Sequence, residues 1–352
     1  MRSYKSKIVW FLICPFLLLF FLIYITISMY FYDPLQLFSE KYHDSYNEIG
    51  DNRFVARRVI SNYDFDSVIL GTSMLLANDP QELQNGKYVN ISINGSSFIE
   101  RSYILNYLFS NKNNVKNILY SFDYINNELI HYKKDISLFY KLDSTLFDKF
   151  KFYFQGHLDY KCLVFLLKNR ECIGDYENYY LSKNNDYEEI VKKVGNDYKF
   201  DKKDFFSNNF TRSFNNILNS KKILDDYLIY YIKKYPYTTF HIIIPPNPLL
   251  YYKDYKDDIY MFKNLSLELL KYKNVKLYFF GNEEFVANMN NYLGDKWHYK
   301  KHINSRINKA INEGSNIISI DNMEEEFNKF IKKVENYDIK AYEEALRLDI
   351  RE

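Results

Sequence analysis

Five short apolar or alternating runs recur along the chain, and each ends abruptly at a glycine, a proline or a polar residue. Consecutive apolar residues, as in Val68–Leu70, are typical of strands buried on both faces. Segments with helical spacing of apolar residues, such as Ile99–Ser110, separate the runs, and this alternation indicates a mostly parallel sheet. We therefore expect a three-layer α/β fold with strands at Phe65–Gly71, Lys87–Ile93, Val115–Phe122, Thr238–Ile244 and Asn274–Gly281.

Two of the expected helices bear on the site. The first begins at about Ser73 and ends near Pro80, because proline cannot continue a helix. The second is a long amphipathic helix over Phe214–Tyr235. It precedes a strand that ends in a double proline, Pro245-Pro246.

The N-terminus carries an uncharged apolar run, Ile8–Tyr32, long enough to cross about 30 Å of hydrocarbon as a helix. Basic residues precede the run and acidic residues follow it, so the positive-inside rule puts the main domain outside the cytoplasm. A cleaved signal peptide has a shorter apolar core and small residues before its cleavage site. We expect a retained single-pass anchor in the inner or plasma membrane. The flanking charges are Arg2, Lys5, Lys7, Asp33 and Glu40.

These features divide the chain into four expected parts. Residues 1–32 form a cytoplasmic start and a transmembrane anchor, and residues 33–62 form a polar helical stalk. Residues 63–320 form the α/β domain, which carries a helical insertion at about 126–203 that is rich in Lys, Asp and Tyr. Residues 321–352 form a charged helical tail with a solvated face.

The composition narrows the choice of partners. The formal net charge is +2, which argues against nucleic acid as the main partner. The 36 tyrosines and 29 phenylalanines are spread along the chain, which favours a coding bias over carbohydrate platforms. Cys14 lies in the apolar run, whereas Cys162 and Cys172 form a disulfide or remain two reduced thiols, depending on the compartment. We expect no cofactor.

Chemistry-bearing residues follow three of the strands: Ser73, Gly95 and Asp123. In an open parallel sheet such strand ends meet at one crevice. Asp295 and His298, three residues apart, have the spacing that lets a carboxylate orient an imidazole, and an imidazole so oriented can take a proton from a serine hydroxyl. Each residue also has a simpler reading: a helix cap for Ser73, a tight turn for Gly95 and an ordinary half-buried imidazole for His298.

A metal site is the alternative reading of the C-terminal motif. His298 and His302 lie one helical turn apart, and Asp295 is close in sequence. A closed metal site needs more ligands than these, and no further ligand cluster is evident. We expect no metal.

The order of the motifs resembles the SGNH (GDSL-type) hydrolase family over about Val68–His298. The resemblance extends to a membrane-anchored branch that includes alginate acetylation proteins and the D-alanyl transfer protein of teichoic acid synthesis. It implies a flavodoxin-like three-layer sheet, Ser73 as nucleophile, His298 as general base and Asp295 as its orienting acid. The backbone N–H groups of Ser73 and Gly95 would form the oxyanion hole. The motifs that carry the resemblance are "LGTSM", "IIIPPNP" and "DKWHY".

The chain departs from the family at one position. The family has an asparagine after the third strand, whose amide completes the oxyanion hole, and this chain has Asp123. An ionised carboxylate only accepts hydrogen bonds, so it would repel an oxyanion. Either Asp123 is protonated or structural, or Asn126 or Asn127 supplies the donor, or the site is slow, since one lost donor costs about 10²–10³ in rate. Further candidate donors at the second strand end are Asn90 and Asn94.

Two functions follow as hypotheses. The first is a membrane-anchored serine esterase or acyltransferase that acts on acyl groups of a bacterial surface polysaccharide. Its partner would be a surface glycan or an acyl donor, and a membrane acyltransferase is a further candidate partner. The second is a non-catalytic assembly or binding protein with the same fold. A plain tethered binding domain is a third reading.

Overall fold

In the computed structural model the chain divides into two compact units. The first comprises residues 1–62 and 134–181, and the second comprises residues 63–133 and 182–352. The structure describes residues 15–27, 56–57, 59–61, 63–123, 145–152, 217–293 and 298–338.

The second unit is built on a sheet of six strands in the order β2-β1-β3-β4-β5-β6. All neighbouring pairs are parallel except β5 and β6, which are antiparallel. The expectation of a mostly parallel α/β fold is therefore confirmed. The strands are β1 (Ser67–Leu70), β2 (Tyr88–Asn90), β3 (Asn117–Ser121), β4 (Thr239–Ile244), β5 (Val275–Phe279) and β6 (Ile317–Ile318).

The strands form where the sequence offers residues that both faces of the sheet can bury. Every residue of β1 and of β3 is buried, so both faces of these strands are covered. The register pairs Ile69 with Leu119 and Leu70 with Tyr120. β6 was not expected from the sequence, because two residues, of which only Ile318 is buried, carry no periodicity.

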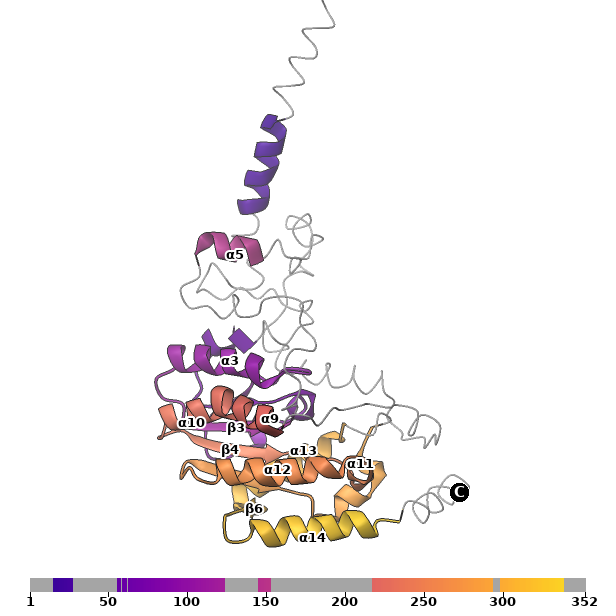
Figure 1. Cartoon of the computed structure of the whole chain (residues 1–352). Coiled ribbons are helices and arrows are strands. Elements are labelled where there is room, and N and C mark those ends of the chain that lie inside the picture. The colour runs from indigo at the N-terminus through magenta and orange to yellow at the C-terminus, as the bar shows by residue number, and fades with distance from the viewer. Residues whose placement is uncertain are drawn as a thin grey trace, which may run out of the picture. The chain divides into compact units, whose positions relative to one another are not determined.

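Helices cover the sheet on both sides. Right-handed crossovers put the helices that follow β2, β3 and β4 on one face, where successive helices contact one another (Figure 1). The β1–β2 connection runs in the opposite direction and so emerges on the other face, where α13 packs against its turn η2. The elements are η2 (Pro80–Glu82), α3 (Phe98–Asn111), α9 (Ile217–Leu224), the π-helical turn η5 (Asp225–Ile229), α10 (Tyr230–Lys234), α11 (Leu249–Asp254), α12 (Lys256–Leu269), α13 (Lys301–Glu313) and α14 (Met323–Asn336).

The prediction of a helix from Ser73 to about Pro80 is wrong. Only a three-residue 3-10 turn, η1 (Ser73–Leu75), follows β1. Its carbonyls are satisfied from elsewhere in the chain: the Asn90 side-chain amide donates to the carbonyls of Leu75 (2.8 Å) and Asn78 (2.9 Å). A helix does not need to continue when a buried side chain takes over its carbonyl acceptors.

The C-terminal helix α14, Met323–Asn336, lies in the expected helical tail, 321–352, but not all of its surface is solvated. Its side chains Phe327 and Phe330 are buried, and both contact Phe279 of β5, with ring centroids 4.7 Å and 5.2 Å from it. The opposite face of the helix is charged, with three glutamates in the first turn. The helix is therefore amphipathic and contributes to the core of the second unit.

A buried histidine lies in the middle of the sheet. His241 of β4 is 1% exposed, and its Nδ1 lies 3.1 Å from the Tyr278 hydroxyl and its Nε2 3.3 Å from the Asn117 amide oxygen. A neutral imidazole has one donor and one acceptor nitrogen, which match these two partners. Burial, assisted by the charge of Lys276, lowers the pKa of His241 to about 4.

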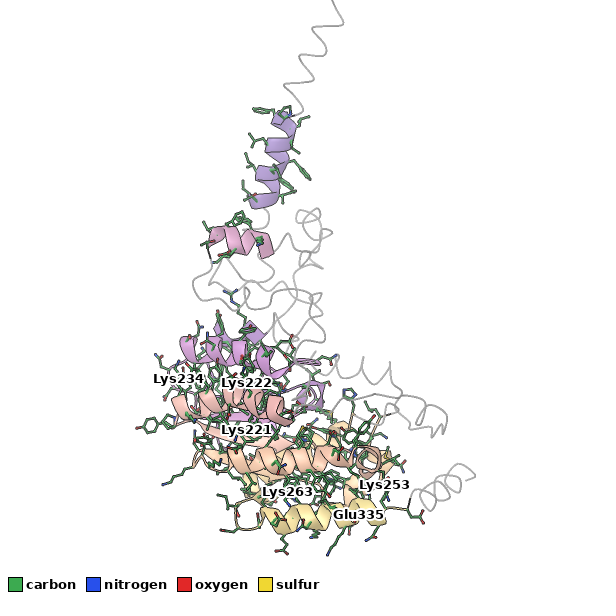
Figure 2. The ribbon with its side chains drawn as sticks, viewed as in Figure 1. Lys221, Lys222, Lys234, Lys253, Lys263 and Glu335 are labelled. Atoms are coloured by element: carbon green, nitrogen blue, oxygen red, sulfur yellow. The ribbon has the colours of Figure 1, made fainter. Side chains whose placement is uncertain are left out.

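Lysines on the outer surface of the helices pair with carboxylates (Figure 2). Lys221 lies 2.9 Å from Glu268, and Lys263 lies 2.6 Å from Glu324. In each pair one side chain is exposed by about half or more, Lys221 at 49% and Glu324 at 65%, and ion pairs at the surface contribute about 0–1 kcal/mol each.

The first unit contains an apolar helix over residues 15–27 and α5 (Leu146–Phe152). The large apolar side chains of the first helix are exposed, with Phe16 at 72%. No helix among the described residues has both the length and the hydropathy needed to span a membrane. The expected anchor, Ile8–Tyr32, and the expected insertion, 126–203, extend outside the described residues.

Candidate functional site

The site lies at the carboxyl end of β1, where the strand order reverses between β2 and β3. This switch point is where open α/β sheets bind ligands. Ser73 is the first residue of η1, and its Oγ lies 2.7 Å from Nε2 of His298. The two side chains are 225 positions apart in sequence, so only the fold brings them together.

A small antiparallel hairpin holds His298. Tyr292 and Tyr299 form a β-bridge, and the N–H of Leu293 donates to the carbonyl of His298 at 2.7 Å. The Tyr292 hydroxyl donates to the carbonyl of Pro246 at 2.7 Å, which ties the hairpin to the double proline after β4. Tyr292 therefore joins the double proline to the neighbour of His298, Tyr299, although the sequence indicates no link between these segments.

The hydrogen bond between Ser73 and His298 has the geometry for proton transfer. Nε2 accepts the hydroxyl proton only if the imidazole proton is on Nδ1. Asp295, the expected orienting acid for Nδ1, lies outside the described residues. The structure therefore joins two of the three expected triad members.

Gly71 makes the close approach of β1 to its neighbours possible. A Cβ at this position would lie 2.7 Å from Cβ of Ser121 and 2.9 Å from Cδ1 of Leu75. The Gly71 carbonyl accepts hydrogen bonds from the N–H of Ile93 (2.8 Å) and the hydroxyl of Ser96 (3.1 Å). These bonds hold the Asn94-Gly95 turn beside the start of η1.

Two backbone N–H groups are available for an oxyanion. Within the described residues, neither the N–H of Ser73 nor that of Gly95 donates to an acceptor. Ser73 begins a helical turn, where N–H groups have no intrahelical partner, and Gly95 adopts the left-handed conformation with φ of 60°. Asn94 is exposed in the same turn, whereas the Asn90 amide is committed to the carbonyls after η1. The prediction of Asn90 as a further oxyanion donor is therefore wrong, because its amide already donates to these carbonyls.

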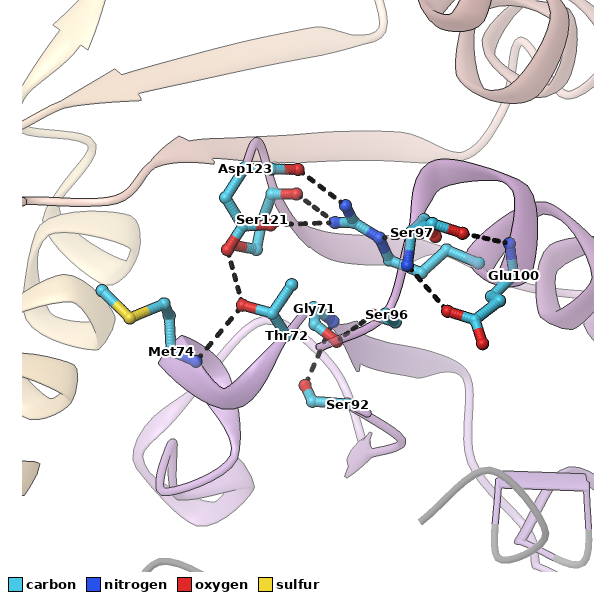
Figure 3. Close-up of polar contacts among 10 residues, drawn as sticks. Gly71, Thr72, Met74, Ser92, Ser96, Ser97, Glu100, Ser121 and Asp123 are labelled. Atoms are coloured by element: carbon cyan, nitrogen blue, oxygen red, sulfur yellow. Dashed lines mark hydrogen bonds and ion pairs between the residues drawn. The ribbon is translucent and has the colours of Figure 1, made fainter. Parts of the chain in front are cut away.

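Asp123 supports the turn that carries Ser73 (Figure 3). Its Oδ2 accepts hydrogen bonds from the hydroxyls of Thr72 (2.5 Å) and Ser121 (2.8 Å). Its Oδ1 lies 3.4 Å from Nη1 of Arg101. These contacts agree with the alternative in which Asp123 has a structural role.

Arg101 is the residue that the sequence reasoning missed. It lies on the buried face of α3, is 0% exposed, and donates to the carbonyls of Ser121 and Asp123. Its guanidinium carbon lies 4.5 Å from the ring centroid of Phe98 and 4.7 Å from that of Tyr120. A signal was present, because Arg101 is three residues after Phe98 and falls on the apolar face of the expected helix.

His302 does not join His298 at a common centre. Its Nε2 lies 3.0 Å from the Asn291 amide oxygen, whereas His298 contacts Ser73. Burial, with the charges of Arg306 and Lys300, lowers the pKa of His302. Among the described residues no three metal-binding side chains come together.

The other expected site residues lie outside the described residues. These are Asp295, Asn126 and Asn127, together with Cys14, Cys162 and Cys172. The triad acid, the third oxyanion donor and the disulfide therefore stay predictions.

Comparison of the chain with protein-family models, curated proteins and solved structures found no match. The functional argument therefore depends on the arrangement of Ser73, His298 and the strand ends around them.

Proposed function

We propose that the protein is a membrane-anchored serine esterase or acyltransferase of the SGNH type, acting on acyl groups of a bacterial surface polysaccharide. The observation that carries the proposal is the 2.7 Å contact between Ser73 Oγ and His298 Nε2 at the switch point of the sheet. The strand order β2-β1-β3-β4-β5 is that of flavodoxin-like sheets, and this supports the SGNH reading.

The proposed reaction proceeds through an acyl-enzyme. Ser73 Oγ bonds to the acyl carbon while His298 Nε2 takes the hydroxyl proton, and the N–H groups of Ser73 and Gly95 hold the developing oxyanion. The tetrahedral intermediate then expels the donor alcohol, which takes the proton from His298. Water or a glycan hydroxyl attacks the acyl-enzyme by the same path and restores Ser73. Asp295 would orient His298 throughout.

The oxyanion hole needs another donor in this scheme, because Asp123 is engaged with Thr72, Ser121 and Arg101. Asn126 and Asn127 follow β3 closely and are the side chains we assign to this role as alternatives. With neither in place, the enzyme would be slower by about 10²–10³.

The proposed location is the outer side of the membrane. The apolar helix over residues 15–27 exposes its side chains and lies within the uncharged run Ile8–Tyr32, which supports an anchor. A tethered active site suits a substrate that is made or displayed at the membrane. The partner we propose is a surface glycan or an acyl donor, with a membrane acyltransferase as a further candidate.

A fluorophosphonate probe tests the proposal, because it labels serines whose hydroxyl is activated. The purified full-length protein should be labelled at Ser73, and Ser73→Ala and His298→Ala should abolish the labelling. Ser110→Ala and His302→Gln are the matched controls, since both residues are exposed and contact neither partner of the pair. Folded wild-type protein that resists the probe would contradict the catalytic reading.

A second function, a non-catalytic assembly or binding protein, is favoured by one observation. A carboxylate, Asp123, follows β3 at the position where the family has an amide donor. This alternative expects Ser73→Ala to leave polymer modification intact in cells, whereas deletion of residues 1–32 abolishes it. The catalytic proposal expects Ser73→Ala to abolish modification as well.

A further inference from the structure

A continuous set of buried polar contacts runs from α3 to the turn that carries Ser73. It begins at Arg101 and passes to the carboxylate of Asp123. From Asp123 it reaches the hydroxyl of Thr72 (Figure 3). Thr72 immediately precedes Ser73 and is the N-cap of η1. Among the described residues none of these three side chains forms a hydrogen bond or ion pair with His298, and the proposed mechanism makes no use of them.

The first link is a buried charge pair. Arg101 is fully buried, and the Asp123 side chain is 11% exposed. A buried guanidinium needs a counter-charge and acceptors for its N–H groups. Asp123 supplies the carboxylate and one carbonyl, and Ser121 supplies the second carbonyl. The capping box of Ser97 and Glu100 fixes the start of α3 and with it the position of Arg101.

The second link sets the direction of the hydrogen bonds. An ionised carboxylate only accepts, so the Thr72 hydroxyl must donate its proton to Asp123 Oδ2, at 2.5 Å. The hydroxyl lone pairs then remain to accept the N–H of Met74, at 3.3 Å. A neutral partner that could donate to Thr72 would leave this orientation undetermined.

Ser73 lies between Thr72 and Met74, which are joined by the hydrogen bond from the Met74 N–H to the Thr72 hydroxyl. We propose that Arg101 and Asp123 are positioning residues that act through Thr72 to hold the Ser73 hydroxyl against His298. This inference rests on the proposed function only in naming Ser73 as the nucleophile. It assigns a purpose to the departure at Asp123: the position after β3 gives up an oxyanion donor and holds the nucleophile turn instead.

Two substitutions of Thr72 test the inference in the full-length protein. Thr72→Val removes the hydroxyl and keeps the shape, whereas Thr72→Ser keeps the hydroxyl. We expect Thr72→Val to lower the rate of fluorophosphonate labelling at saturating probe by about 10²-fold, the cost of misplacing a reacting group by about 1 Å. Thr72→Ser should label within a few-fold of wild type. A purely structural threonine would give equal rates once both variants are shown to be folded.

A second measurement does not depend on reactivity. The imidazole NMR signals of His298 report its contact with Ser73, and Ser73→Ala gives the signals of the broken contact. We expect Thr72→Val to resemble Ser73→Ala, and Thr72→Ser to resemble wild type. If wild type is not labelled but this NMR pattern holds, the positioning role stands and the catalytic proposal fails.

The inference is overturned if wild type is labelled and Thr72→Val is labelled at the same rate, or if Thr72→Val leaves the His298 signals unchanged. Should Thr72→Val not fold, Arg101→Lys carries the same test. It keeps the charge but cannot reach two carbonyls and a carboxylate at once. Wild-type labelling and wild-type His298 signals in folded Arg101→Lys would likewise overturn the inference.

Discussion

Asp123→Asn would install an amide at the position where the SGNH family has one, and on the family pattern alone it should raise activity. The structure leads to the opposite expectation. The substitution removes the only carboxylate paired with Arg101 among the described residues. It also allows the side chain to present N–H groups to Thr72, whose hydroxyl must donate for the nucleophile turn to keep its bonds.

The magnitude follows from burial. Removing one partner of a buried ion pair costs about 3–5 kcal/mol of unfolding free energy, because the remaining charge stays in the interior. Arg101 keeps its two carbonyl partners, so we expect the lower end, about 3 kcal/mol. For a domain of this size that lowers Tm by roughly 6–12 °C.

An exposed pair provides the matched control. Lys87 lies 3.0 Å from Asp64, closer than Arg101 to Asp123, but its side chain is 65% exposed and that of Asp64 is 96% exposed. Asp64→Asn should therefore cost less than about 1 kcal/mol. The longer but buried contact is expected to have the larger effect.

Thermal unfolding and fluorophosphonate labelling of the full-length variants measure both expectations. Asp123→Asn should unfold at lower temperature and label more slowly than wild type. The double variant Arg101→Met with Asp123→Asn removes both charges. Its loss of unfolding free energy should be smaller than the sum of the losses in the two single variants. The reasoning is refuted if Asp123→Asn matches Asp64→Asn in stability, or if it labels faster than wild type.

Two further predictions concern Gly71 and His241. Gly71→Ala would place a Cβ 2.7 Å from that of Ser121 and should lower the free energy of unfolding by about 3 kcal/mol in denaturant titrations. Gly314→Ala should lower it by about 1 kcal/mol, because its new Cβ meets no atom within 4 Å and only the backbone φ of 67° is unfavourable. Equal losses would contradict the packing argument. The pKa of His241 is about 4 in the fold and 6.5 in the unfolded chain. Between these two pH values the unfolded chain binds a proton that the folded protein does not bind. The free energy of unfolding should therefore fall by up to about 3 kcal/mol as the pH is lowered through this window. His241→Asn should flatten this dependence in unfolding measurements at pH 7 and near pH 4, and an unchanged slope would refute the assignment.

The sequence by itself determined the features that depend on neighbouring residues. Consecutive apolar residues and polar strand ends located β1, β3, β4 and β5, because burial on both faces of a sheet demands such runs. The Gly-Thr-Ser end of β1 also pointed to Ser73. His298 was named by its spacing from Asp295, a local signal that needs no fold.

Only the tertiary structure decided what depends on residues far apart in the chain. A 3-10 turn stands where a helix was expected at Ser73, because the side-chain amide of Asn90, on the next strand, donates to the carbonyl of Leu75. Asp123 was read as a departure from a motif, but its contacts with Arg101 and Thr72 give it a place in the support of the nucleophile turn. The sequence states which chemical groups a residue carries. The partners of those groups depend on which strands and helices lie side by side. These partners decide whether a carboxylate repels an oxyanion or neutralises a buried arginine.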